Sequence, residues 1–169
     1  MANGIVRVGL VGAGGNTRLR HAPGFRDQSG VEIVSVANRS RESGERFAGE
    51  FEIPKVYDSW VDLINADDTD AICIGTWPYM HRTLTLAALE AGKHVLCEAR
   101  MAMNAKEAHD MLDASRLKPH LIAQIVPAPS TLDVDSTIQG LIADGYLGEI
   151  LAVKLRVSNT EGRGNRNDT

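Results

Sequence analysis

The fold is decided near the start of the chain, by the stretch IVRVGLVGAGGNT at residues 5–17. Residues 5–11 form a short apolar run that predicts a buried strand. The glycines that follow open a predicted helix over 16–26, which Pro23-Gly24 is expected to end or bend. Such a turn lets a pyrophosphate approach the N–H groups of a helix N-terminus closely, because no Cβ stands in the way. The residues expected to hold a dinucleotide here are Gly12, Gly14, Gly15 and Asn16.

The match to the dinucleotide fingerprint is incomplete, because Thr17 stands where a third glycine is usual. That third position governs the packing of helix on strand more than contact with phosphate. A merely tight turn is the alternative interpretation, but a place after the first strand and inside a βαβ unit favours dinucleotide binding. A P-loop is excluded, since no Gly-Lys-Ser/Thr run follows these glycines.

Strand and helix patterns alternate along most of the chain. Further strand candidates lie at 31–37, 53–57, 71–75, 94–97 and 121–126. Helix candidates begin at Ser59 and span 41–51, 81–91, 105–117 and 131–143. Helices between successive apolar strands require parallel pairing and cover both faces of the sheet. The pattern predicts an α/β protein with a doubly wound parallel sheet, the Rossmann fold.

The composition is that of an ordinary globular protein. The 169 residues are 43% hydrophobic and 24% charged, with a formal net charge of -4. An acidic chain argues against a nucleic-acid partner, because phosphate binding needs a basic face. No segment reaches the roughly 20 apolar residues of a membrane helix, and no signal peptide is expected. We therefore expect a cytoplasmic protein without a membrane partner.

The two cysteines, Cys73 and Cys97, each lie inside an apolar run. This placement favours two buried, reduced thiols. A disulfide or metal site would need a closer or richer Cys/His cluster, so we expect no bound metal.

The pattern changes near residue 148. Leu151, Val153, Leu155 and Val157 alternate with less apolar residues, which predicts a strand with one buried face, typical of an antiparallel sheet. We expect a dinucleotide-binding domain over 1–148 and, over 149–169, the opening strand of a truncated second domain.

The end of the second predicted strand bears on the choice of cofactor. An acidic residue there would bind the ribose of NAD, but the sequence has Asn38, Arg39, Ser40 and Arg41. An arginine fork and a serine hydroxyl suit the 2′-phosphate of NADP. The alternative is two solvated charges beside a helix start, where cations are disfavoured. NADP is favoured over NAD, with Asn38, Arg39 and Ser40 as candidate cofactor-binding residues.

Three motifs together resemble one family. VGLVGAGG at 8–15, LAALEAGKHVLCE at 86–98 and GYLGEI at 145–150 resemble the glucose–fructose oxidoreductase / inositol dehydrogenase (Gfo/Idh/MocA) family, over residues 5 to about 158. The resemblance implies a Rossmann domain coupled to an α+β C-terminal domain. It also implies hydride transfer between NAD(P) and a carbinol or carbonyl carbon, usually of a sugar, polyol or related compound.

The family's Glu-Lys-Pro motif falls at 98–100. Glu98 matches, and the resemblance implies a place near the nicotinamide-side ribose. Ala99 replaces the lysine and Arg100 replaces the proline. Alanine cannot handle a proton and arginine is a poor proton shuttle, so no catalytic residue is assigned.

Further cofactor-binding residues follow from the family's Thr-Pro-Asn-x-x-His segment, which falls at 76–81. Thr76 closes a strand at the carboxyl edge of the sheet, where open α/β sheets bind ligands, and Pro78 follows it. His81 either lies near the cofactor or is a helix-start residue with a satisfied ring, and both remain open. Gln124 lies where the family often places an amide near the nicotinamide.

The favoured function is an NAD(P)-dependent oxidoreductase acting on a small molecule, a sugar or polyol, with this chain as its cofactor-binding part. Ala99 motivates an alternative, a non-catalytic dinucleotide-binding regulatory module. A homo-oligomer formed through the sheet of the second domain is a further expectation.

Overall fold

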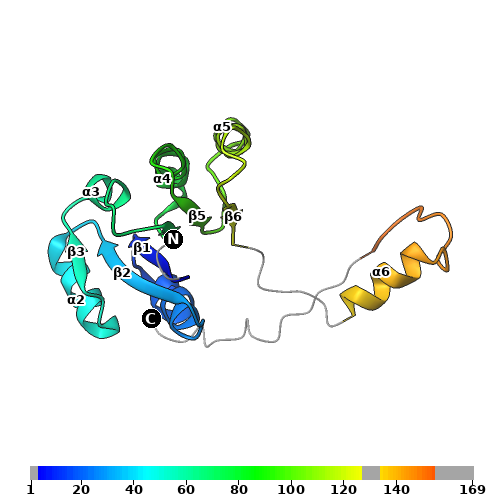
Figure 1. Ribbon diagram of the computed structural model, residues 1–169. Coiled ribbons are helices and arrows are strands. Elements are labelled where there is room, and N and C mark those ends of the chain that lie inside the picture. Colours follow the sequence, from blue (N-terminus) through cyan, green and yellow to red (C-terminus); the bar gives the residue numbers. More distant parts are fainter. Residues whose placement is uncertain (1–3, 127–133, 155–169) are drawn as a thin grey trace, which may run out of the picture. The chain divides into compact units, whose positions relative to one another are not determined.

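The computed structural model describes residues 4–126 and 134–154 (Figure 1). The chain divides into two compact units, Met1–Ala128 and Pro129–Thr169. Each unit is described by itself. Among the described residues, no helix has the length and apolar character needed to cross a membrane.

The first unit is built on a six-stranded sheet with the order β3-β2-β1-β4-β5-β6. Every pair of neighbouring strands is parallel. The strands are β1 (Val6–Val11), β2 (Val31–Ala37), β3 (Lys55–Tyr57), β4 (Ala71–Ile74), β5 (His94–Cys97) and β6 (Ala123–Ile125). Strand order reverses direction between β1 and β4, which is the switch point at which doubly wound sheets bind ligands. The predicted Rossmann fold is confirmed.

Helices cover both faces of this sheet (Figure 1). On one face lie α3 (Trp60–Ile64), α4 (Pro78–Glu90) and α5 (Ala105–Leu117), whose buried side chains pack with the β4 isoleucines and Cys97. On the other face, α1 (Ala22–Arg26) and α2 (Arg41–Phe51) pack with β1, β2 and Cys73. Cys73 and Cys97 are buried free thiols, as predicted, and burial raises the pKa of each to about 12.

Side-chain caps begin three of these helices where the sequence predicts a helix start. The Oγ of Ser59 accepts a hydrogen bond from the N–H of Asp62 (3.1 Å) at the start of α3. Ser40 caps α2 and Asn104 caps α5 in the same way.

Two helix starts differ from the prediction. The glycine turn leads into a π-helical turn, η1 (Thr17–His21), which continues as α1 through Pro23-Gly24. Pro23 does not end this helix, because it lies in the first turn of α1, where its missing N–H is not needed. In α4 the helix begins at Pro78, three residues before the expected start, for the same reason.

The second unit contains α6 (Asp135–Ala143). The predicted helix covered 131–143, and residues 131–133 lie outside the described residues. The strand expected from about residue 150 is not formed over 151–154, which have no regular structure, and residues 155–158 lie outside the described residues. An alternating sequence forms a strand only with a partner that accepts its backbone hydrogen bonds.

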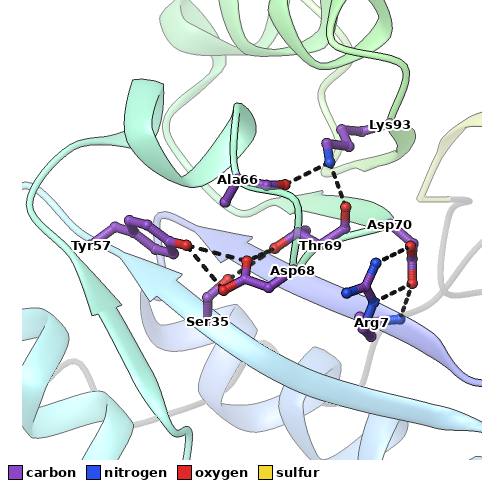
Figure 2. Close-up of polar contacts among 8 residues, drawn as sticks. All are labelled: Arg7, Ser35, Tyr57, Ala66, Asp68, Thr69, Asp70 and Lys93. Carbon is purple, nitrogen blue, oxygen red and sulfur yellow. Dashed lines mark hydrogen bonds and ion pairs between the residues drawn. The ribbon is translucent and has the colours of Figure 1, made fainter. Parts of the chain in front are cut away.

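A polar network holds the loop before β4 at the amino edge of the sheet (Figure 2). Arg7, on β1, binds Asp70 through Nε (2.9 Å) and Nη2 (2.7 Å), which lowers the pKa of Asp70 from its ordinary 3.8 to about 2. The Nζ of Lys93 donates to the carbonyl oxygens of Ala66 (2.7 Å) and Thr69 (2.6 Å). We call Arg7, Lys93 and the 66–70 loop the amino-edge network.

Candidate cofactor site

A cleft of about 590 Å³ opens at the carboxyl edge of the sheet, beside the switch in strand order. Four segments line it: the end of β1 with its glycine turn, the end of β2, the turn after β3 and the turn after β4. A groove at this place is where open α/β sheets bind ligands.

The glycine turn is closely packed at Gly12, against Thr76, and open at Gly14 and Gly15. Gly12 has φ +82°, and a Cβ there would lie 2.5 Å from Cγ2 and 2.8 Å from the backbone nitrogen of Thr76. Only glycine fits that position without strain. A Cβ at Gly14 or Gly15 would meet nothing within 4 Å, so the space in front of the turn is free for a ligand.

Thr17 packs the helix on the strand from the position of the usual third glycine. It is buried, and its Oγ1 donates to the carbonyl oxygen of Gly12 (3.3 Å). A Cβ added to Gly75, directly after β4, would lie 2.3 Å from Thr17 Oγ1 and 2.7 Å from the carbonyl oxygen of Gly12. Both the buried Thr17 side chain and the glycine turn therefore require a glycine at position 75.

Asn38 fixes the glycine turn to the end of β2. Its Oδ1 accepts a hydrogen bond from the N–H of Ala13 at 2.7 Å. The predicted cofactor residue Asn38 thus lines the cleft and also supports the loop.

The two arginines after β2 have different surroundings. Arg41 donates to Asp58 (Nη1 to Oδ1, 2.7 Å) and to Glu45 (Nε to Oε1, 2.8 Å), and hydrogen bonds to these carboxylates raise the pKa of Arg41. Arg39 is exposed, lines the cleft, and has no hydrogen bond or ion pair among the described residues. Of the two, Arg39 is the cation available to a ligand. The Oγ of Ser40, also predicted for this site, is occupied as the α2 cap.

Glu98, directly after β5, is held by three donors. Its Oε1 accepts from the Nδ2 of Asn16 and lies 2.5 Å from the Nε2 of His21, and its Oε2 accepts from the N–H of Ala99 (2.9 Å). The side chains of His21 and Glu98 are only 10% and 12% exposed. This carboxylate therefore ties the helix after the glycine turn to the end of β5.

His81 is fully buried and connects two turns. Its Nε2 lies 2.9 Å from the carbonyl oxygen of Thr76, and its Nδ1 lies 2.8 Å from that of Arg100. Both ring nitrogens of His81 thus face backbone carbonyl oxygens, and His81 does not line the cleft. The Oγ1 of Thr76 is buried without a partner among the described residues, a state that a bound ligand can relieve.

The structure brings some of the predicted residues together and not others. Gly12, Gly14, Asn38, Arg39 and Thr76 line one cleft, and Asn16 contacts Glu98. The other seven do not line the cleft. Asn16 and Glu98 contact each other, Ser40 caps α2, Gly15 faces open space, Pro78 begins α4, His81 is buried and Gln124 is exposed on β6.

Sequence reasoning missed several cleft residues, namely Asp58, Ser59, Trp60, Trp77 and Tyr79. Their position after predicted strands was a usable signal, because the carboxyl ends of parallel strands share one edge. His21 gave no such signal, since its place depends on the π-helical turn. Within the described part of the chain, no group of three His, Cys, Asp or Glu side chains could hold a metal ion.

Known proteins resemble this chain. A family model described as an oxidoreductase family with an NAD-binding Rossmann fold matches residues 6–124. Trans-1,2-dihydrobenzene-1,2-diol dehydrogenase of Bos taurus is 32% identical over 151 residues, covering 89% of this chain and 44% of the relative. 1,5-Anhydro-D-fructose reductase of Ensifer adhaerens is 40% identical over 110 residues, covering 65% of this chain and 33% of the relative.

Solved structures agree. Biliverdin reductase from Synechocystis, in complex with biliverdin and NADP+, superposes with a TM-score of 0.66 at 32% identity, covering 71% of this chain and 37% of that one. The chain thus spans less than half the length of the relatives it matches.

Proposed function

The chain belongs to the Gfo/Idh/MocA family of oxidoreductases with an NAD-binding Rossmann fold, and from this premise we propose that it binds NADP in preference to NAD as the cofactor-binding part of an oxidoreductase. The proposed reaction is hydride transfer between the nicotinamide and a carbinol or carbonyl carbon of a sugar, polyol or related compound. The names of two relatives, a diol dehydrogenase and an anhydrofructose reductase, support that substrate class.

One observation carries the choice of NADP. Arg39 is exposed at the cleft without a partner among the described residues, while Arg41 neutralises the nearby carboxylate of Asp58. A free guanidinium recognises a phosphate through paired hydrogen bonds. The NADP+ bound to the biliverdin reductase relative is consistent with this choice.

The described residues fit the cofactor. The open space at Gly14 and Gly15 admits a pyrophosphate at the start of the helix, and Arg39 would hold the 2′-phosphate. Glu98 would lie on the nicotinamide side, with its acceptor orientation fixed by Asn16 and His21. When bound, the cofactor supplies or accepts the hydride.

Calorimetry with NADPH tests the binding site. Gly14→Val should abolish measurable binding while the protein stays folded, because the valine side chain occupies the pyrophosphate space and its Cβ meets no atom within 4 Å. Gly49→Val, equally open but on α2 and outside the cleft, is the control and should bind as wild type does. Equal NADPH affinity of wild type and Gly14→Val would refute the assignment.

The cofactor preference has its own test. Arg39→Ala should weaken NADPH by about 1.5–3 kcal/mol, the range for a hydrogen bond to a charged group, and leave NADH nearly unchanged. Arg46→Ala, on the same side of the sheet in α2 but outside the cleft, should change neither affinity. An equal loss of affinity for NADPH and NADH, or no loss for either, would show that Arg39 is a solvated surface residue without contact to the 2′-phosphate.

Ala99 supports a second candidate, a non-catalytic dinucleotide-binding regulatory module. We expect the 169-residue chain to bind NADPH without oxidising it over a panel of sugars, inososes and small aldehydes. The same assay on a longer protein, in which this chain is followed by a second domain, distinguishes the oxidoreductase from the regulatory module. Turnover there supports the enzyme, and binding without turnover supports the module.

The proposal extends to the context of the domain. We propose that the Rossmann domain ends near residue 148, that the protein is cytoplasmic, and that it forms homo-oligomers through the sheet of a second domain. The two buried free thiols support a reducing compartment. Sedimentation of the full-length protein would measure its oligomeric state.

A further inference from the structure

Two donors on the helix after the glycine turn meet one carboxylate oxygen at the end of β5. The Oε1 of Glu98 accepts a hydrogen bond from the Nδ2 of Asn16 and lies 2.5 Å from the Nε2 of His21. An ionised carboxylate only accepts hydrogen bonds, so the Nε2 of His21 is the donor in this contact. The side chains of His21 and Glu98 are only 10% and 12% exposed. Two donors in a nearly closed site hold the carboxylate in one orientation.

The π-helical turn η1 is what brings both donors to the same oxygen. Asn16 and His21 are five residues apart. In an α-helix, residues at this spacing point about 140° away from each other around the helix axis. The turn is instead closed by a hydrogen bond that spans five residues, from the N–H of Ala22 to the carbonyl oxygen of Thr17. Residues five apart then lie on nearly the same side, and single π-helical turns are frequent at functional sites.

The second oxygen of Glu98 keeps an open acceptor position. Among the described residues, Oε2 accepts only from the N–H of Ala99 (2.9 Å). The carboxylate also lies near the apolar interior, because burial and, after it, the charge of Glu98 raise the pKa of the Cys73 thiol to about 12. A charged group costs the fold free energy in such a place, and a well-packed apolar pair is often as stable. Contact with a ligand therefore explains the carboxylate better than packing does.

We propose, on the premise that the chain binds NADP as set out above, that His21 is a positioning residue for the nicotinamide half of the cofactor. With Asn16 it holds Oε1 of Glu98, so that Oε2 stays turned toward a hydroxyl donor on the nicotinamide-side ribose. The same two residues lie on the helix that follows the glycine turn, so they also keep the pyrophosphate site and this acceptor at a fixed separation. His21 acts through Glu98 and does not itself contact the cofactor.

Two ligands separate the halves of the cofactor. NADPH carries both halves, whereas 2′,5′-ADP carries only the adenosine half with its 2′-phosphate. By calorimetry, His21→Leu should weaken NADPH on the order of 10-fold, the lower end for a lost hydrogen bond to a charged group, and leave 2′,5′-ADP nearly unchanged. His109→Leu, at an exposed histidine of α5 outside the cleft, is the matched control and should change neither affinity.

Rescue by a donor distinguishes positioning from packing. His21→Gln keeps an N–H donor that can reach Glu98 and should recover most of the NADPH affinity, whereas His21→Asn is too short and should behave as His21→Leu does. In a Glu98→Ala background, His21→Leu should change NADPH affinity little further, because the acceptor that His21 positions is already gone. A merely structural role of His21 would weaken NADPH and 2′,5′-ADP alike in all of these variants.

The outcomes separate this proposal from the proposed function. NADPH binding by wild type with an unchanged affinity in His21→Leu, or with an equal loss for NADPH and 2′,5′-ADP, overturns the role of His21 alone. The same holds if His21→Gln loses as much NADPH affinity as His21→Leu. If His21→Leu does not fold, His21→Asn supplies the comparison. No NADPH binding by wild type overturns the role of His21 and the proposed function together.

Discussion

The two edges of the sheet differ in whether their large side chains have partners within the fold. At the amino edge, Arg7 is paired with Asp70 through three hydrogen bonds, and Lys93 with two carbonyl oxygens (Figure 2). At the carboxyl edge, Arg39 has no partner among the described residues and Trp77 is 75% exposed. Arg7 and Lys93 are thus occupied by contacts within the fold, whereas Arg39 and Trp77 remain able to meet a ligand.

The carboxyl edge is itself divided. Around β2 and β4 the cleft is open, whereas at β5 the carboxylate of Glu98 is enclosed by Asn16, His21 and the Ala99 N–H. The adenosine half of the proposed site is therefore formed by free side chains, and the nicotinamide half by a preassembled polar cluster.

The largest expected effect on stability lies at the carboxyl edge, and so it tests how far the two edges differ. Gly12→Ala should lower the free energy of unfolding by about 2–4 kcal/mol, since a Cβ meets Thr76 and the backbone has positive φ. Urea denaturation measures the loss. Gly14→Ala, with an open position, should cost less than about 1 kcal/mol, and similar losses for both would contradict the packing described for Gly12.

Substitution of Arg7 tests whether the amino edge contributes to stability without affecting cofactor binding. Arg7→Ala should lower the free energy of unfolding clearly more than Arg116→Ala does, because it leaves the partly buried carboxylate of Asp70 without its charged donor. NADPH affinity should not change. Arg116→Ala, in a pair whose side chains are both 69% exposed, should cost less than about 0.5 kcal/mol. A change in NADPH affinity caused by Arg7→Ala would show that the edges are coupled.

Acid should weaken the same network. The pKa of Asp70 is about 2 when folded and about 3.8 without its partner, so its contribution is present above pH 4 and is lost as pH falls toward 2. The expected loss is about 1–2 kcal/mol after allowance for solvent screening. Urea midpoints between pH 5 and pH 2.5 measure it. Asp70→Asn should reduce the change of the urea midpoint with pH. An unchanged pH dependence in this variant would show that other carboxyl groups cause it.

The smallest effects are expected at the open cleft. Arg39→Ala and Trp77→Ala should each change the free energy of unfolding by less than about 0.5 kcal/mol, because both side chains are exposed and Arg39 has no described partner. Thermal and urea unfolding of both variants measure this. A loss above 1.5 kcal/mol in either would mean that the side chain supports the fold itself.

Local patterns predicted the sheet and its helices, because apolar runs, caps and glycine turns act within a few residues. The π-helical turn and the start of α4 at Pro78 were not predicted, since each depends on geometry at a helix start. The predicted strand near residue 150 shows the limit of alternation, because residues 151–154 form no strand in the described part of the second unit.

The site was predicted where the sequence carries a motif. Gly12, Gly14, Asn38 and Arg39 line the cleft, but pairs of residues far apart in sequence could not be foreseen. Arg7 and Asp70 are 63 residues apart, and His21 and Glu98 are 77 apart. Whether any of the predicted residues contacts a cofactor stays a prediction.

Thr17 and Gly75 show that a binding fingerprint can be shared between two segments of a chain. Thr17 has a side chain where a third glycine is usual, and Gly75, directly after β4, has none at the facing point. A side chain at position 75 would meet both Thr17 and the carbonyl oxygen of Gly12. A search for three glycines in one loop will pass over proteins built in this way.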